Sequence, residues 1–443
     1  MAETNYKTRL YWGRETPNLP SLDLLKIHKT SFQKFLDTGL DEVVREINPI
    51  EDITGKNYRL EFSKLTLGKP AITPDEAVEK GLTYDAPLKV YAKLTNKQTE
   101  ETINQEVFLC DIPLMLERGT FIVNGVERAI VHQLVRAPGA YYSAAMDPGT
   151  GKILYTAEIR PLRGSWLEFS LSRTDTINVK IDRRRKFPVT TFLRAIGLSS
   201  NEEILEAFKF LPEEELQFIH NTLAKDTTTN ADEALIEIYR RMRPGDPLVL
   251  DTARAMVEGM FFNDRRYNLA EVGRYKMDRK LKDVKPLIKT GDDEEINPLI
   301  LNKKDLLASI TYLVGLSFNK GRVDDIDHLG NRRVRSVGEL TQQNAFRVGI
   351  LRLERVIRER MTTANPEIPP TPATLVNARP VMSAINEFFR TSQLATILDQ
   401  TNPLAEVDTM RRLSVMGTGG ITRERAAFSI RDINSSQYSR ICP

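Results

Sequence analysis

The amino-acid sequence predicts an α+β protein with more than one domain, and three observations carry that prediction. First, 443 residues, 41% of them hydrophobic, are enough for about two or three globular cores. Second, the first third of the chain contains short runs in which apolar and polar residues alternate, as in antiparallel strands. Third, helical spacing of apolar residues dominates the middle of the chain and returns near residue 336. We therefore expect antiparallel sheets with packed helices, and a second domain inserted into the first.

The first segments of the chain predict an arm followed by a helix. Residues 6–20 are polar but include Tyr11 and Trp12. This composition fits an extended arm that docks through aromatic side chains, and it fits a frayed terminus equally well. From 21 to 37 apolar residues recur at helical spacing, and we expect Gly39 to end that helix.

Strand-like alternation follows, and we expect antiparallel strands at 58–62 and 88–94, and a third that starts at 106–109 and ends near Pro113. The next signal is more specific, because two apolar runs at 121–123 and 126–131 flank the dipeptide Asn124-Gly125. Both of these residues accept the positive φ angles that a two-residue type I′ turn requires. The sequence therefore predicts a β-hairpin here.

A second domain is expected to begin near the polar, glycine-containing segment 143–151. We expect its strands at 153–159 and 166–172, and helices at 190–196, 202–210, 213–223, 231–241 and 303–317. The acidic residues 292–295 are most simply a solvated loop.

One long helix is predicted at 336–361. Its buried stripe would consist of Phe346, Ile350, Leu353, Ile357 and Met361. The other face is rich in arginine, and Glu354 precedes Arg358 by four residues, a spacing worth only about a few tenths of a kcal/mol. A proline-rich linker at 364–372 then leads into a further helical stretch at 375–389.

Charge and cysteine content limit the class of protein. The 63 Lys+Arg and 60 Asp+Glu residues give a net charge of +3, so any signal for nucleic-acid binding must be local. Cys110 and Cys442 cannot form a disulfide framework, and no charged-then-apolar leader opens the sequence. No apolar run approaches the roughly 18 residues that a membrane span needs. We therefore expect a cytoplasmic protein with no membrane partner.

Three residue groups suggest metal or phosphate chemistry, and each has a simpler interpretation. Asp324, Asp325 and Asp327 could form a magnesium cluster, but alternation along a short segment spreads their side chains, and nearby arginines offer ion-pair partners. The four histidines show no ligand spacing with the cysteines, which argues against zinc. The glycine-rich segment 417–420 lacks a following Lys-Ser/Thr, so a turn is favoured over a phosphate-binding loop.

Residues 388–443 have the composition of a functional surface and not of a hydrophobic core. Apolar residues are sparse, and arginines lie close to the glycines at 417–420; they are Arg411, Arg412, Arg423, Arg425, Arg431 and Arg440. Basic side chains beside flexible backbone indicate a polyanionic partner. The run 182–186, Asp-Arg-Arg-Arg-Lys, fits a solvated strand end and a phosphate-contacting strip equally well.

Several segments resemble, in the same order, the β subunit of bacterial multisubunit RNA polymerase. They are GTFIVNGVERAIVHQLVRAPGAYYS from Gly119, RPLRGSWLEF from Arg160, DRRRKFP from Asp182, DDIDHLGNRRVRSVGEL from Asp324, and SQL, LDQTNPLAE, RRLS, GTGGITRERA and RICP after residue 391. The resemblance implies four regions: the first part of the protrusion at 1–142, the lobe at 143–330, the second part of the protrusion at 331–392, and the start of the fork domain at 393–443.

The same resemblance implies a DNA-directed RNA polymerase, a nucleotidyltransferase, in which this chain forms one side of the DNA/RNA cleft. Its expected partners are the β′, α and sigma subunits together with DNA and RNA. The catalytic Mg²⁺ would be held by β′, so we expect no cofactor and no catalytic residue in this chain, which would be an N-terminal piece of β. The alternative is a free-standing nucleic-acid-binding or assembly protein that retains the polymerase scaffold without catalysis.

Seven positions match residues that contact DNA in the family, namely Arg136, Trp166, Asp182, Arg183, Asp327, Arg332 and Arg423. An indole offers a base a stacking platform, and a carboxylate beside a guanidinium can read an unpaired guanine edge. Without the resemblance, a tryptophan that follows Gly164-Ser165 in a strand would be assigned to the core.

Eight positions match the rifampicin pocket beside the RNA path, namely Gln393, Thr396, Ile397, Asp399, Thr409, Arg412, Ser414 and Met416. Three of them, Thr396, Ile397 and Thr409, stand where drug-sensitive members usually have glutamine, phenylalanine and histidine. We therefore expect rifampicin to inhibit the complete enzyme poorly. The chain also departs from the family at 434–439, where most bacterial members have a His-Pro-Ser/Thr-His-Tyr-Gly run. These departures fit a divergent bacterial lineage or relaxed constraint, and the intact register and the retained arginines favour the first.

Overall fold

The computed structural model describes residues 23–52, 55–288, 297–364, 369–422, 424 and 432–442. The chain forms two compact units: unit 1 comprises Met1–Gln133 and Arg335–Thr418, and unit 2 comprises Leu134–Val334 and Gly419–Pro443. The chain leaves unit 1 within strand β7 (His132–Arg136) and returns within strand β13 (Arg332–Arg335). Helices and antiparallel sheets occur in both units, as expected for an α+β fold.

Unit 1 is built on a sheet with the strand order β1-β2-β3-β4, whose neighbours all pair antiparallel. The strands are β1 (Ile50–Glu51), β2 (Tyr58–Leu67), β3 (Asp85–Asn96) and β4 (Thr102–Pro113). In β3 every second side chain from Ala86 to Leu94 is buried, so one face of the strand packs on the core. The three predicted strands are confirmed: β2 and β3 extend beyond 58–62 and 88–94, and β4 ends at Pro113 as expected but begins earlier, at Thr102.

The first helix does not end at Gly39, so that prediction was wrong. Helix α1 (Lys26–Lys34) continues through a π-helical turn, η1 (Phe35–Gly39), into α2 (Leu40–Ile47). Gly39 keeps a helical φ of −66° and packs against the Gln342 side chain. The next turns bury Leu40 and Val43 in the core of unit 1. This burial outweighs the helix penalty of one glycine, about 1 kcal/mol.

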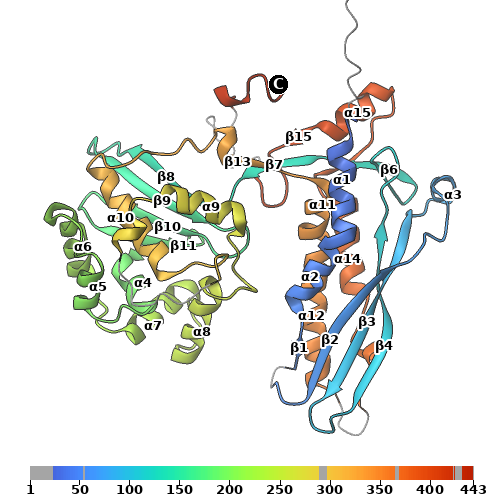
Figure 1. Ribbon diagram of the computed structural model, residues 1–443, viewed down its shortest axis with the longest axis horizontal. Helices are drawn as coiled ribbons and strands as arrows, with labels where there is room; N and C mark the ends of the chain where they lie inside the picture. Colours follow the sequence, from blue (N-terminus) through green and yellow to red (C-terminus); the bar gives the residue numbers. More distant parts are fainter. Residues whose placement is uncertain are drawn as a thin grey trace, which may run out of the picture. The chain divides into compact units, whose positions relative to one another are not determined.

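The long helix predicted at 336–361 is confirmed, with a π-helical turn inside it. Its parts are α11 (Val337–Leu340), η4 (Thr341–Phe346) and α12 (Arg347–Thr362). The whole predicted stripe is buried, and Arg358 pairs with Glu354 at 2.7 Å. Two further helices follow, α13 (Pro372–Leu375) and α14 (Arg379–Thr391). In Figure 1 helices α1, α2, α12 and α14 lie alongside the β2-β3-β4 sheet, and their apolar faces join the same core.

The remaining elements of unit 1 are short. They are α3 (Pro74–Glu79), β5 (Phe121–Val123), β6 (Val126–Ile130), β14 (Ala395–Ile397), α15 (Pro403–Arg411) and β15 (Leu413–Ser414). The β5–β6 hairpin is confirmed: Asn124 and Gly125 have φ angles of +54° and +73°, as a type I′ turn requires. Strand β14 pairs antiparallel with β6, and β15 pairs parallel with β7. These pairings anchor segments of the expected fork region on the hairpin and on β7.

Unit 2 contains a five-stranded antiparallel sheet with the order β12-β11-β10-β9-β8. The strands are β8 (Gly139–Met146), β9 (Ile153–Arg160), β10 (Leu167–Leu171), β11 (Ile177–Ile181) and β12 (Phe187–Pro188). Ser143 lies inside β8, and the polar segment after Met146 connects β8 to β9.

Helices pack on this sheet and complete the core of unit 2. They are α4 (Val189–Ala195), α5 (Asn201–Ala207), α6 (Glu213–Lys225), α7 (Ala231–Met242), α8 (Leu250–Phe261), α9 (Ala270–Lys280) and α10 (Lys303–Ser317), with short turns η2 (Lys285–Leu287), η3 (Leu329–Asn331) and η6 (Ser435–Gln437). Helix α10 has the predicted bounds and is buried on nearly all sides. In the described part of the chain, no helix is both long and apolar enough to cross a membrane.

Candidate nucleic-acid interface

Trp166 lies just before β10, and two guanidinium groups lie over its indole. The Arg160 guanidinium, at the end of β9, is 4.1 Å from the ring centroid, and that of Arg183, in the turn after β11, is 4.8 Å away. Trp166 is partly exposed and does not belong to the hydrophobic core of unit 2. The core assignment that the sequence pattern alone favours was therefore wrong, and a cation–π stack takes its place.

Asp182 positions this stack. Asp182 and Arg183 have φ angles of +47° and +60°, and the Arg184 backbone N–H donates to the Ile181 carbonyl at 2.9 Å, which closes a tight turn. The Asp182 carboxylate accepts a 2.7 Å hydrogen bond from the Trp166 backbone N–H, and the Asp182 N–H donates to the Trp166 carbonyl at 3.0 Å. Aspartate tolerates this left-handed backbone because its short side chain bonds locally.

Arg136 is linked to the stack through Glu158. The Glu158 carboxylate accepts hydrogen bonds from Arg136 and from Arg160, both at 2.9 Å. Burial, together with repulsion from Arg160, lowers the pKa of Arg136 to about 10, while Glu158 and Asp327 act in the opposite direction. Arg136 therefore remains a cation at neutral pH, although it is largely removed from water.

Asp327 and Arg332 form an ion pair with each other. The other two aspartates of this segment have different partners: Asp324 pairs with Lys280 of α9 at 2.7 Å, and Asp325 accepts a 2.8 Å hydrogen bond from Asn434. That hydrogen bond is the main cause that lowers the pKa of Asp325. Two of the three aspartates thus form ion pairs, although Lys280 was not among the expected partners, and Asp325 binds an amide instead. Unit 2 thus brings together six of the seven predicted DNA contacts, whereas Arg423 lies outside the described residues.

Glu158 and Arg160 were not among the predicted site residues. A signal was present, because the two alternate on one strand and therefore share a face of the sheet. In the strand register Glu158 faces Glu168, and Glu168 faces Lys180 on the next strand. A polar stripe thus crosses three strands and ends beside the Trp166 stack.

The predicted drug-pocket positions lie in unit 1, and the first four lie within β14 or next to its ends. The Ile397 side chain is 65% exposed, and the Thr396 hydroxyl donates to the Ala129 carbonyl of β6 at 3.4 Å. Gln393 and Asp399 are exposed on either side of the strand, where Asp399 accepts two hydrogen bonds from Thr401.

The side chains at the other four positions differ in how exposed they are. Thr409 is only 5% exposed, and its hydroxyl donates to the Ala405 carbonyl within α15 at 2.9 Å. Arg412 is exposed and pairs with Asp408 at 3.3 Å, whereas Ser414 and Met416 are partly buried. The Met416 carbonyl accepts a hydrogen bond from the Gln133 amide at 3.0 Å, which ties this segment to β7. Seven of the eight side chains are thus at least partly exposed, and Thr409 is turned inward.

Comparison with known proteins gives the family. Two family models match the chain: "RNA polymerase Rpb2, domain 2" at residues 136–335 and "RNA polymerase Rpb2, domain 3" at residues 396–443. The DNA-directed RNA polymerase subunit beta of Chloroflexus aggregans is 45% identical over 441 residues, which cover 95% of this chain and 36% of that protein. The chain thus spans about a third of the length of this relative. The six described residues that were predicted to contact DNA all fall within the first matched range. The chain belongs to the family of bacterial RNA polymerase β subunits, of which it represents an N-terminal part.

Proposed function

We propose that this chain forms one side of the DNA/RNA cleft of a multisubunit DNA-directed RNA polymerase. Unit 2 would contact the unpaired non-template strand, and the segment around β14 and α15 would line the path of the nascent RNA. The observation that carries the proposal is the partly exposed Trp166 indole with Arg160 and Arg183 over it. Indole and guanidinium planes are the platforms on which unpaired bases stack, and the cations also attract phosphates.

The two arginines differ in how firmly they are held. Arg160 is bonded to Glu158 at 2.9 Å and its side chain is only 16% exposed. Arg183 has a 3.8 Å contact with Glu168 and its side chain is 50% exposed. An incoming base would therefore displace Arg183, because a cation–π contact at an exposed site is worth only about 0.5–1 kcal/mol. Arg160 would stay and keep the indole in place.

The chemistry of nucleotide addition would belong to the complete enzyme. Asp324, Asp325 and Asp327 each bind a different partner, so their carboxylates do not converge on a common point. On the resemblance to RNA polymerase β subunits, we assign the catalytic Mg²⁺ to the partner β′ subunit, with α and sigma completing the assembly. In this scheme the residues described here bind and orient nucleic acid.

The test compares Trp166→Ala with the unchanged chain in a reconstituted polymerase bound to forked DNA. If a non-template base stacks on the indole, the substitution should weaken binding by about 1–3 kcal/mol, or roughly five- to 150-fold. Trp166→Phe keeps an aromatic face and should retain part of the affinity. Fully paired DNA serves as the control, since it offers no unpaired base and should be insensitive to both variants. Equal affinity of all three proteins for forked DNA would refute the stacking role.

A further inference from the structure

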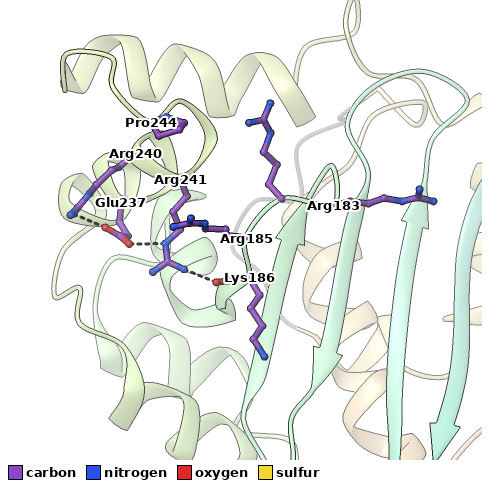
Figure 2. Close-up of a pocket in the computed structure, with 8 residues that line it drawn as sticks. Arg183, Arg185, Lys186, Glu237, Arg240, Arg241 and Pro244 are labelled. Carbon is purple, nitrogen blue, oxygen red and sulfur yellow. Dashed lines mark hydrogen bonds and ion pairs between the residues drawn. The ribbon is translucent and has the colours of Figure 1, made fainter. Parts of the chain in front are cut away.

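A second cationic feature of unit 2 lies beside the turn that carries Arg183. It is an open basin of about 1000 Å³, shown in Figure 2, which we call the basic basin. Its lining residues are Arg183, Arg184, Arg185, Lys186, Glu237, Arg240, Arg241 and Pro244. Six of the eight are cations and one is a carboxylate, a local net charge of +5, whereas all 443 residues together carry only +3.

Arg241 holds the two walls of the basin together. Its guanidinium donates to the Lys186 carbonyl at 2.6 Å and to the Glu237 carboxylate at 2.7 Å, and it lies 5.6 Å from the centroid of the Phe187 ring. Arg240 also pairs with Glu237, at 2.6 Å. The one carboxylate of the basin is thus shared by two arginines of α7 and is not available to the turn.

The cations of the turn remain available to a ligand. Arg184, Arg185 and Lys186 are exposed, and none of them has an ion pair among the residues that the structure describes. In Figure 2 Arg185 points toward the α7 arginines, whereas Arg183 points the opposite way, toward the strands of the sheet. The turn therefore presents positive charge on two sides: one side serves the Trp166 stack and the other faces the basin. Clustered like charges repel one another, and an external anion relieves that repulsion.

We infer that the basic basin binds phosphate groups of the DNA backbone, next to the base that stacks on Trp166. This inference rests on the proposed function, and it assigns to α7 a role that the Trp166 stack does not require. None of the eight residues that line the open basin is aromatic, and the Phe187 ring beside Arg241 is buried, so the basin offers charge but no platform for a base or an apolar side chain. Recognition would therefore be independent of sequence and steeply dependent on salt.

The test measures how DNA affinity depends on salt concentration, using the complete polymerase that contains this chain. The double variant Arg184→Gln/Arg185→Gln should reduce the slope of log K against log salt by about 2, and Arg240→Gln should reduce it by about 1. Arg254→Gln is the matched control, because Arg254 is an exposed arginine of the neighbouring helix α8, paired with Asp232 outside the basin. It should leave the slope unchanged. Arg241 is not substituted, since it supports the fold of the basin.

The outcomes separate this inference from the proposed function. Trp166→Ala should weaken binding to forked DNA with little change in slope, whereas the basin variants should change the slope on forked and fully paired DNA alike. An unchanged slope in the double variant would overturn the basin as a phosphate site and leave the stacking role standing. If poly-glutamate binds the unchanged chain through the basin while the DNA slope stays constant, the basin serves an acidic protein and the inference is wrong.

Discussion

At the scale of single residues, exposure separates the positions that can meet a ligand from those that cannot. Ile397 is 65% exposed on β14, whereas Thr409 is 5% exposed and bonded within its own helix. Both replace aromatic side chains that drug-sensitive relatives are expected to carry. A larger residue is therefore tolerated at Ile397, while at Thr409 it would have to displace the groups that bury this position.

We predict that a polymerase containing this chain is poorly inhibited by rifampicin. Each lost polar contact in a buried site costs about 1–3 kcal/mol, and lost packing adds to that, so a combined loss of about 3–5 kcal/mol would weaken affinity by hundreds to thousands of times. Thr396→Gln/Ile397→Phe should restore part of the sensitivity in a transcription titration. Thr409→His should instead destabilise unit 1. Inhibition of the unchanged enzyme at nanomolar drug would contradict the prediction.

At the scale of elements, close helix contacts depend on glycine. A Cβ atom added to Gly349 of α12 would lie 2.8 Å from the Val381 Cα of α14, and one added to Gly338 would overlap the Ser31 carbonyl of α1. Gly315 of α10 differs, since a Cβ there would meet its nearest neighbour, in Lys320, at an ordinary 3.5 Å. The same residue type thus has a packing role in α11 and α12 and none in α10.

Gly349→Ala should therefore lower the free energy of unfolding of unit 1 by about 1–3 kcal/mol, because α12 and α14 would have to separate. The control Gly315→Ala should be neutral or stabilise unit 2 by up to about 1 kcal/mol, since alanine favours helix and the site has room. Urea denaturation of the whole chain, followed by hydrogen exchange in each unit, measures both changes. A similar response to the two substitutions would show that packing against Val381 is not the cause.

A buried pair of histidines joins α1 to β7. The His28 Nδ1 lies 3.2 Å from the His132 Nε2, and both side chains are buried. Burial and the charge of His132 lower the pKa of His28 to about 3, and burial also lowers the pKa of His132. Below about pH 6.5 the unfolded chain therefore binds protons that the folded chain excludes.

Stability should consequently fall as the pH drops from about 6.5 toward 3, by up to about 1.4 kcal/mol per pH unit for each histidine. His28→Gln keeps a hydrogen-bonding side chain without this titration, so its unfolding free energy should depend less steeply on pH. Asp85 acts in the opposite direction, because burial raises its pKa to about 6 and its protonation favours the folded state. Its contribution is common to both proteins and cancels in their difference. Parallel curves for the two proteins between pH 7.5 and pH 5 would exclude the histidine effect.

At the scale of the whole molecule, the chain consists of two units with separate hydrophobic cores. The expected domain limits at 1–142, 143–330, 331–392 and 393–443 remain predictions. The chain passes from one compact unit to the other near residues 133, 334 and 418. The Trp166 stack and the basic basin both belong to unit 2, whereas the predicted RNA-path residues belong to unit 1.

The isolated chain should bind forked DNA weakly and with strong salt dependence, yet add no nucleotide by itself. The exposed arginines of unit 2 motivate the first half of this prediction, and the proposed assignment of the catalytic Mg²⁺ to the β′ subunit motivates the second. A filter-binding titration at two salt concentrations and a primer-extension assay with added Mg²⁺ measure the two properties. Nucleotide incorporation that survives purification and requires this chain alone would contradict the second half.

Local patterns in the sequence determined the elements that depend on neighbouring residues. The period of two in β3, the Asn124-Gly125 turn and the stripe of α12 were all predictable, because strand, turn and helix geometry repeat over a few residues. The resemblance of long segments also identified the family.

Only the tertiary structure decided the contacts between distant residues. His28 meets His132 across 104 positions, and Gly39 continues a helix because the core buries the next turn. The Trp166 side chain lies outside the hydrophobic core, where the guanidinium groups of two arginines cover its ring. Such contacts depend on burial and packing between elements, and these arise only when the chain has folded.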